Sequence, residues 1–296
     1  MIFTKRKSLE EIINQTKESI FWEYDILYKN ITTIHLGGNV KYLALPRDFK
    51  GLKCLIKNLI KSKIEYMVIG NGSNTLITEY DGVLISLKCL KSYILETDKY
   101  IKVSSNLSLN YLALKYAKRN LDTFLFGTMV PGVIGGGICT NCGVYNYEMS
   151  KYLIRVKYID EFGKIKNKKV KGFKYRYSPF MNRNCVILDG TFLKHYNEDS
   201  IKIYRNILEK RRKTQPKGYS LGSVFKNGDN YKTGQLIDEC GLKGLSFSNI
   251  VISNAHANII VNEGGDLKTF LDVLLLIEII VILKHGIRLK KEIKII

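Results

Sequence analysis

A glycine-rich stretch in the middle of the chain places the strongest local constraint on its fold. Pro131-Gly-Val-Ile-Gly-Gly-Gly137 holds four glycines and one proline within seven residues, with apolar residues between them. Glycine lets the backbone turn tightly and approach another group closely, so such a segment can present its N–H groups to a flat ligand. A buried turn between packed elements would have the same composition.

A second glycine-rich segment, Gly70-Asn-Gly-Ser-Asn74, follows the short apolar run 65–69 without a clear helix after it. Its backbone N–H groups, together with the side chains of Ser73 and Asn74, can bind a phosphate or pyrophosphate group. An ordinary glycine turn is the alternative for this motif alone. It lacks the G-x-G-x-x-G pattern of a dinucleotide-binding fold.

Helix-type and strand-type patterns alternate along the rest of the chain without a strict βαβ repeat, which predicts an α+β fold. The capping box of Ser8 and Glu11 predicts the first helix. Further helices are expected after Asp48 and Ser108 and over 232–240 and 266–285, and strands over 65–69, 82–87, 152–165 (a hairpin), 250–252 and 258–261. The most apolar run, Phe270–Leu283, is too short to span a bilayer and is expected to be a buried core helix.

The net charge of +20 would suit a nucleic-acid-binding protein, but the lysines are scattered over the whole chain instead of clustering. No nucleic-acid partner is therefore expected, and an anionic small molecule remains compatible with this charge. The start of the chain has no apolar run typical of a signal peptide. Six thinly spread cysteines indicate a cytoplasmic protein with free thiols. The chain has one Cys-x-x-Cys pair, and its four histidines lack the spacing of metal ligands, so no metal site is expected.

A serine between Gly222 and Val224 is a candidate proton donor. Ser223 can deliver a proton to a developing carbanion if a nearby cation lowers the cost of the alkoxide that it leaves. Lys226 and Arg176 are the candidate sources of that charge. Without these neighbours, a Gly-Ser pair is more typical of a turn.

Taken together, these motifs resemble the UDP-N-acetylenolpyruvoylglucosamine reductase family from about Ile31 to the end of the chain. The length, and the short spacing from Arg176 to Ser223, resemble the shorter of the two types of this family (type II). The matching segments are Thr32–Gly38, Gly70–Asn74, Pro131–Tyr145, Tyr175–Ser178, Thr214–Pro216, Gly222–Asn227, Gly234–Gly244, His256–Asn258 and Gly286–Ile293.

The resemblance implies an FAD-binding part of the vanillyl-alcohol oxidase/p-cresol methylhydroxylase type and a C-terminal α+β domain that binds a UDP-sugar. The expected domains are 1–55 and 56–197 for FAD and 198–296 for the substrate. NADPH would reduce the flavin, whose N5 would pass hydride to C3 of UDP-N-acetylglucosamine enolpyruvate in the synthesis of peptidoglycan precursors. The resemblance is compatible with a monomer and implies no membrane partner.

By matching position, Ser223 would protonate C2, and Arg176 and Glu292 would stabilise the enol-like intermediate. Lys226, Asn227 and Gln215 are expected to contact the substrate. The residues expected to bind FAD are Thr33, Gly70, Asn71, Gly72, Ser73, Asn74, Pro131, Gly132, Gly135, Gly136, Asn141 and Gly143.

The sequence departs from the family pattern at several positions. Ser248-Asn249-Ile250 stands where the family has Gly-Gly-Ala, and Tyr219 and Leu221 replace a proline and an alanine before Ser223. Two other functions stay open: an FAD-dependent oxidase of the same superfamily, and a basic protein without enzymatic activity. The motifs around Ser223, Lys226 and Glu292 argue against the oxidase.

Overall fold

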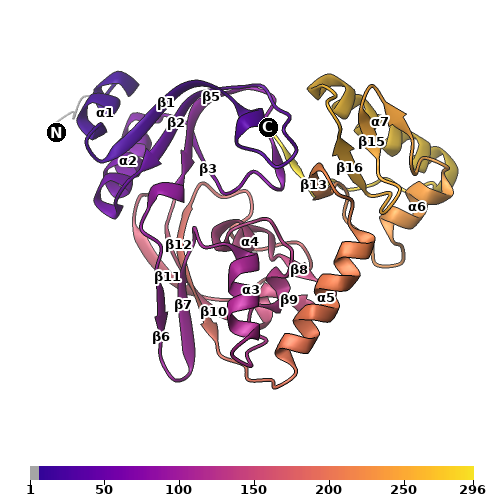
Figure 1. The fold of residues 1–296 in the computed structure, drawn as a ribbon. Helices are drawn as coiled ribbons and strands as arrows, with labels where there is room; N and C mark the ends of the chain where they lie inside the picture. Colours follow the sequence, from indigo (N-terminus) through magenta and orange to yellow (C-terminus); the bar gives the residue numbers. More distant parts are fainter. Residues whose placement is uncertain (1–6) are drawn as a thin grey trace. The chain divides into compact units, whose positions relative to one another are not determined.

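The computed structural model describes residues 7–296, which form two compact units (Figure 1). The first unit contains the residues up to Ile26, Val40–Gly70 and Asp81–Ile207. The second contains Leu27–Asn39, Asn71–Tyr80 and Leu208–Ile296, so three separate stretches of sequence fold together in it. The expected functional domains 1–55, 56–197 and 198–296 stay a prediction.

The first unit begins with a four-stranded sheet in the order β1-β2-β5-β3, and α1 and α2 share a hydrophobic core with it. Both helices begin where the sequence predicts: Ser8 and Glu11 form a capping box, and Asp48 accepts a hydrogen bond from Gly51 N–H. The elements are α1 (Leu9–Thr16), β1 (Ile20–Leu27), β2 (Asn39–Pro46), α2 (Phe49–Ser62), β3 (Tyr66–Ile69), β5 (Tyr80–Ser86) and η2 (Leu87–Cys89). Between β1 and β2, η1 (Tyr28–Asn30) belongs to the second unit.

A five-stranded sheet in the order β11-β10-β12-β7-β6 follows, with α3 and α4 packed against it. The predicted hairpin is confirmed, since β10 and β11 pair antiparallel through a turn in which Gly163 has a φ of 75°. Ser108 caps α3, as expected. The elements are β6 (Ile94–Glu96), β7 (Tyr100–Ser104), α3 (Leu109–Ala117), η3 (Leu125–Gly127), α4 (Ile134–Thr140), β8 (Gly143–Val144), β9 (Tyr147–Glu148), η4 (Met149–Lys151), β10 (Leu153–Ile159), β11 (Ile165–Lys169) and β12 (Val186–Leu193).

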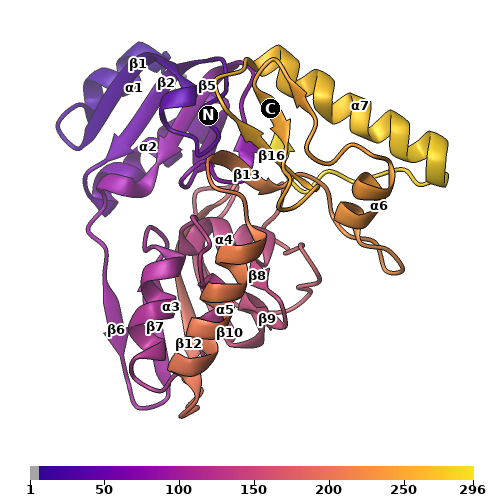
Figure 2. The ribbon, with the colours of Figure 1, turned by 45° about the vertical axis from the view of Figure 1, so that its right-hand side comes forward.

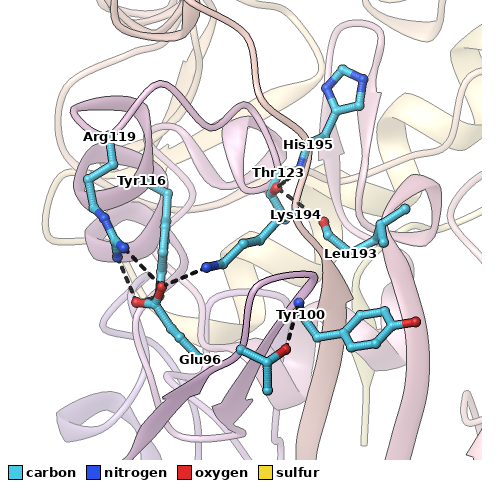
Figure 3. A network of polar contacts seen from close by, with 9 residues as sticks. Glu96, Tyr100, Tyr116, Arg119, Thr123, Leu193, Lys194 and His195 are labelled. Carbon is cyan, nitrogen blue, oxygen red and sulfur yellow. Dashed lines mark hydrogen bonds and ion pairs between the residues drawn. The ribbon is translucent and has the colours of Figure 1, made fainter.

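Glu96, at the end of β6, is the centre of a polar network in this unit (Figure 3). Its carboxylate accepts two hydrogen bonds from Arg119, at 2.6 and 2.9 Å, and one from the hydroxyl of Tyr116 at 2.9 Å. Lys194 lies 3.3 Å from the same carboxylate. The hydrogen bonds from Arg119 are the main reason that the pKa of Glu96 falls to about 2. The network joins the end of α3 to the strands beside it.

The second unit contains an antiparallel sheet in the order β13-β16-β15-β14, together with α6 and α7. Its core joins Ile34 and Leu76 to Phe225 and Phe270, from distant parts of the sequence. The elements are β4 (Thr75–Leu76), β13 (Tyr219–Ser223), α6 (Thr233–Glu239), β14 (Ser246–Phe247), β15 (Ile250–Ile252), β16 (Ile259–Asn262), α7 (Leu267–His285) and β17 (Lys294–Ile295). The chain passes from the first unit to the second within α5 (Ser200–Thr214), a helix that the sequence analysis missed.

Helix α7 has the predicted limits, with Asp266 as its N-cap and Gly286 at φ 66° as its C-cap (Figure 2). The expectation of a buried helix is wrong for one of its faces. Phe270 is fully buried, but Leu283 is 80% exposed and Leu275 is 55% exposed. Ile279 and Ile282 continue the same exposed stripe at helical spacing. None of the helices in residues 7–296 combines the length and apolar character needed to cross a bilayer.

Candidate functional site

The central glycine-rich stretch forms the short helix α4 in the first unit. The N–H groups at the start of this helix bond to neighbouring backbone: Ile134 to the carbonyl of Leu107, and Gly135 to that of Ser105 at 2.8 Å. Gly136 is exposed, and no described atom lies within 4 Å of the position that a Cβ would take there. Gly136 therefore leaves room for a ligand against the backbone.

The end of β3 approaches this stretch closely. A Cβ on Gly70 would lie 2.9 Å from a methyl group of Val133, so a larger residue at position 70 would push the two segments apart. Pro131 is exposed beside this contact, and Gly132 is buried. The first residue of the 70–74 motif therefore lies close to the central glycine-rich stretch within the first unit.

The loop that follows Gly70 lies in the second unit and forms no helix, as the sequence predicts. Gly72 has a φ of 59°, and a Cβ there would lie 2.7 Å from the carbonyl oxygen of Ile31. The hydroxyl of Thr32 donates to the carbonyl of Gly72 at 2.7 Å. Asn71 is exposed and Ser73 is half-buried. This tight loop leaves its outer polar groups able to face a phosphate.

Thr33 and Asn74 connect this loop region to the C-terminal part of the second unit. The hydroxyl of Thr33 donates to the carbonyl of Ser220 in β13 at 2.7 Å. The side-chain amide of Asn74 donates to the carbonyl of Glu292 at 3.2 Å. Both residues, expected to bind FAD, therefore also support the segments that carry Ser223 and Glu292.

Ser223 and Glu292 lie on paired segments of the second unit. The N–H of Glu292 donates to the carbonyl of Val224, the residue after Ser223, at 2.8 Å. Phe225 and Lys291 pair as an isolated antiparallel bridge. The pairing of β13 with β16 is irregular just before Ser223, where Gly222 has a φ of 72°. Such an irregularity turns the following side chain away from the regular alternation of the strand.

Asn258 is a buried residue that holds the Ser223 segment, and the sequence analysis gave it no role. Its Nδ2 donates to the carbonyl of Phe225 at 2.7 Å, and its Oδ1 accepts the N–H of Phe225 at 3.0 Å. The carbonyl of Asn258 accepts the N–H of Val224. The motif His256-Ala-Asn258 was visible in the sequence, but the long-range pairing that gives Asn258 its role was not.

The three residues expected to contact substrate also lie in the second unit, and all three are half-buried. The carbonyl of Lys226 accepts the hydroxyl of Thr233 at 2.6 Å, and Asn227 Oδ1 accepts the N–H of Thr233 at 3.0 Å. Both residues are thereby fixed against the start of α6. Gln215 directly follows α5 and donates its backbone N–H to the carbonyl of Arg211.

Arg176 belongs to the first unit, in a tight turn next to the segment 139–143. Its backbone has a φ of 50°, and its guanidinium donates to the carbonyl of Gly143 at 3.1 Å. Asn141 is fully buried, with a φ of 48°. Burial raises the pKa of the Cys142 thiol to about 12, and the charge of Arg176 opposes this rise. Cys142 is therefore a protonated packing residue.

The residues present fit an FAD molecule. Gly136 offers open space beside α4, and Gly72 keeps a turn that a side chain would block. In the first unit Pro131 is exposed, and in the second unit Asn71 is exposed and Ser73 is half-buried in the same loop as Gly72. Within residues 7–296, no group of three or more His, Cys, Asp or Glu side chains is arranged to hold a metal ion.

Comparison with known proteins agrees with this arrangement. Residues 40–168 match the family model of an FAD binding domain, and residues 215–296 match that of the UDP-N-acetylenolpyruvoylglucosamine reductase C-terminal domain. The UDP-N-acetylenolpyruvoylglucosamine reductase of Caldanaerobacter subterraneus subsp. tengcongensis is 37% identical over 279 residues, covering 90% of this chain and 91% of its own. That of Clostridium novyi is 33% identical over 98% of this chain and 95% of its own.

A solved structure gives the same result for the fold. The crystal structure of UDP-N-acetylenolpyruvylglucosamine reductase (MurB) from Thermus caldophilus matches with a TM-score of 0.78 and 26% identity. The match covers 93% of this chain and 99% of that protein. The predicted fold, an FAD-binding part followed by the C-terminal α+β domain of this family, is confirmed. The chain belongs to the UDP-N-acetylenolpyruvoylglucosamine reductase family and is an FAD-dependent oxidoreductase.

Proposed function

We propose that the protein uses NADPH to reduce UDP-N-acetylglucosamine enolpyruvate to UDP-N-acetylmuramate, a peptidoglycan precursor. The observation that supports it most directly is the pairing of the Ser223 and Glu292 segments through the 2.8 Å hydrogen bond from Glu292 N–H to the Val224 carbonyl. The backbone segments that carry Ser223 and Glu292 are thus held side by side in a chain of this family.

Reduction of the enolpyruvyl double bond adds a hydride at C3 and a proton at C2. FAD supplies the hydride when it is bound and has been reduced by NADPH. Addition at C3 places negative charge on C2 and on the neighbouring carboxylate of the substrate. Ser223 gives its hydroxyl proton to C2, which completes the product and leaves the serine to be reprotonated.

Arg176 and Glu292 stabilise the intermediate before C2 is protonated. Charge that develops during a reaction is stabilised best by groups already held in place. The guanidinium of Arg176 is fixed to the Gly143 carbonyl, and the backbone of Glu292 is fixed by Asn74 and Val224. The carboxyl group of Glu292 hydrogen-bonds to the enol-like group of the intermediate, and Arg176 supplies the positive charge.

The residues that we propose to hold the two ligands are those that match the motifs of the family. Gly72, Ser73 and Asn71 would bind the FAD phosphates, and Gly136 would let the flavin approach α4. Lys226, Asn227 and Gln215 would bind the UDP-sugar, whose diphosphate carries negative charge. The net charge of +20 favours capture of such an anion.

The deciding experiment is NADPH oxidation by the purified flavin-bound protein, measured with and without UDP-N-acetylglucosamine enolpyruvate. Oxidation that requires the sugar is the expected result, with UDP-N-acetylmuramate as the product. A second set of reactions with NADH measures the preference for NADPH. A flavin-bound protein whose NADPH oxidation ignores the sugar and consumes oxygen would overturn the proposal and support the oxidase alternative.

A further inference from the structure

Two segments of the first unit, 139–143 and 174–178, are joined by three hydrogen bonds from side chains to backbone carbonyls. Ser178 Oγ donates to the carbonyl of Cys139 at 2.8 Å, and Asn141 Nδ2 donates to that of Lys174 at 2.9 Å. The third bond runs from Arg176 to the carbonyl of Gly143 at 3.1 Å. The donors alternate between the segments, so each segment holds the other.

The turn that carries Arg176 is closed by its own backbone. Lys174 and Tyr177 exchange two hydrogen bonds, N–H of Lys174 to O of Tyr177 at 3.1 Å and N–H of Tyr177 to O of Lys174 at 3.0 Å. Arg176 lies at the corner of this turn with a φ of 50°, a left-handed conformation that costs a non-glycine residue free energy. Surrounding contacts must therefore hold the turn in place.

Asn141 is well suited to hold it, because its amide is fully buried and fully used. Nδ2 donates to Lys174 O and, at 3.3 Å, to Glu148 Oε2, while Oδ1 accepts the N–H of Ser150 at 3.0 Å. An amide has two donor hydrogens, and both are given to protein acceptors. The N–H of Ser150 also fixes which end of the amide is the oxygen.

Ser178 is fully buried as well, and its hydroxyl has two partners. It donates to Cys139 O and accepts the N–H of Phe180 at 3.1 Å. Loss of either buried side chain leaves backbone groups without their partner, which favours a shift of the turn.

We infer that Asn141 and Ser178 are positioning residues, which hold the left-handed turn at Arg176 in the place where its guanidinium acts, and that Asn141 serves the reaction through this turn. The effect of the pair on turnover rests on the proposed function of Arg176. Their effect on the turn itself does not.

Limited proteolysis tests the turn without any activity measurement. Trypsin cleaves after lysine and arginine, so Lys174 and Arg176 are two cleavage sites within the turn. The folded protein is digested briefly and cleavage at these two bonds is measured by mass spectrometry. In Asn141→Ala we expect this cleavage to be about tenfold faster than in the unchanged protein. Thr16→Val is the matched control, because the buried hydroxyl of Thr16 binds Ile12 O and the Trp22 indole elsewhere in the same unit. Equal cleavage rates in Asn141→Ala and the unchanged protein would overturn the inference.

Ser178→Ala provides a second variant should Asn141→Ala fail to fold. Ser178→Ala removes one hydrogen bond between the two segments, the one to the carbonyl of Cys139. We therefore expect cleavage at Lys174 and Arg176 to be faster than in the unchanged protein, but slower than in Asn141→Ala. Cleavage that rises equally in Thr16→Val and in both variants would mean that general destabilisation causes it, and would count against the inference.

A double-mutant cycle tests the link to Arg176 in the reaction. Asn141 is among the residues that the sequence predicts to bind FAD, but both of its amide hydrogens are given to protein acceptors. We therefore expect Asn141→Ala to retain flavin and its reduction by NADPH, while transfer to the enolpyruvyl sugar slows about tenfold. In an Arg176→Ala background the same substitution should cause little further loss. If the rate losses of Asn141→Ala and Arg176→Ala multiply in the double variant, or if Asn141→Ala loses its flavin, the inference is overturned. Absence of sugar-dependent turnover in the unchanged protein would instead refute the proposed function, and the proteolysis result would still decide the positioning role.

Discussion

The side-chain amide of Asn74 donates a hydrogen bond to the backbone carbonyl of Glu292, with Nδ2 and O 3.2 Å apart. Asn74 ends the loop proposed to bind the FAD phosphates, and Glu292 is proposed to stabilise the intermediate. Next to this bond, β4 and β17 pair in parallel, with Thr75 opposite Lys294. The proposed phosphate loop and the segment that carries Glu292 are therefore joined by this hydrogen bond and by the pairing of β4 with β17.

Asn74→Ala should slow sugar-dependent turnover about tenfold, even with added FAD, because the Glu292 backbone loses a hydrogen bond. Steady-state kinetics at saturating FAD is the measurement. Thr78→Val is the control, since the hydroxyl of Thr78 donates to Ile296 O at 2.8 Å and joins the same two segments farther from Glu292. Equal losses in the two variants would attribute the effect to the general stability of this pairing.

Ser223→Ala should leave FAD binding and its reduction by NADPH intact, while the enolpyruvyl sugar is turned over about 10²- to 10⁴-fold more slowly. The substitution removes only the proton donor, since Val224 and Phe225 keep their hydrogen bonds to Asn258. Rapid-mixing measurements of the two half-reactions separate these effects. A variant that loses its flavin would assign Ser223 a structural role.

Glu96→Gln should lower the free energy of unfolding by about 1 kcal/mol at neutral pH, because Arg119 and Lys194 lose their carboxylate partner at a partly exposed site. The folded-state pKa of Glu96 is lowered from 4.5 to about 2, so its contribution is present above pH 4.5 and is lost as the pH falls toward 2. Urea unfolding of both proteins between pH 7 and 3 should therefore give a stability difference that shrinks with acidity. A difference that stays constant with pH would contradict this.

Ser248→Gly should raise the free energy of unfolding by about 0.5–1 kcal/mol, because Ser248 has a left-handed φ of 44° that glycine adopts without strain. Asn249, at φ 65°, should gain less from the same change, since asparagine tolerates this conformation. The family pattern described in the sequence analysis has two glycines here, and both positions in this chain have the positive φ that glycine adopts without strain. Thermal unfolding of the two variants compares the gains, and a larger gain at Asn249 would contradict the expectation.

Leu283→Lys should change the free energy of unfolding by less than about 0.5 kcal/mol, because the side chain is mostly exposed on α7. Phe270→Ala in the same helix should cost about 3–5 kcal/mol, because that ring is fully buried. Denaturant unfolding of both variants is the measurement. A large loss in Leu283→Lys would mean that this face is covered in solution.

Much of the fold could be predicted because its signals are local. Capping side chains mark the starts of three helices at Ser8, Asp48 and Ser108, and Gly286 ends α7. Helix α5 was missed because only Ser200, Tyr204 and Ile207 are buried in it, which gives a weak apolar pattern. Asp266 and Gly286 predicted the limits of α7. Its apolar run did not predict which side chains are exposed, since an apolar side chain does not reveal whether anything covers it.

The sequence predicted which residues form the candidate site, but not which segments pair with one another to hold them. Ser223 and Glu292 are 69 positions apart in the sequence, and only the long-range pairing of their segments brings them together. The same applies to Asn258 and Asn141, whose amides bind backbone groups distant in sequence. A local pattern cannot contain such a partner, so these roles appear only once the chain is folded.

The second unit takes its residues from three stretches of sequence, and this determines when it can form during synthesis. Its core packs Ile34 and Leu76 against Phe270 and Ile293. The early stretches leave the ribosome long before their partners exist, so they must wait while about 200 further residues are added at about 5–20 residues per second. We expect this unit to fold only after translation has nearly ended, and residues 208–296 made alone would lack part of their core.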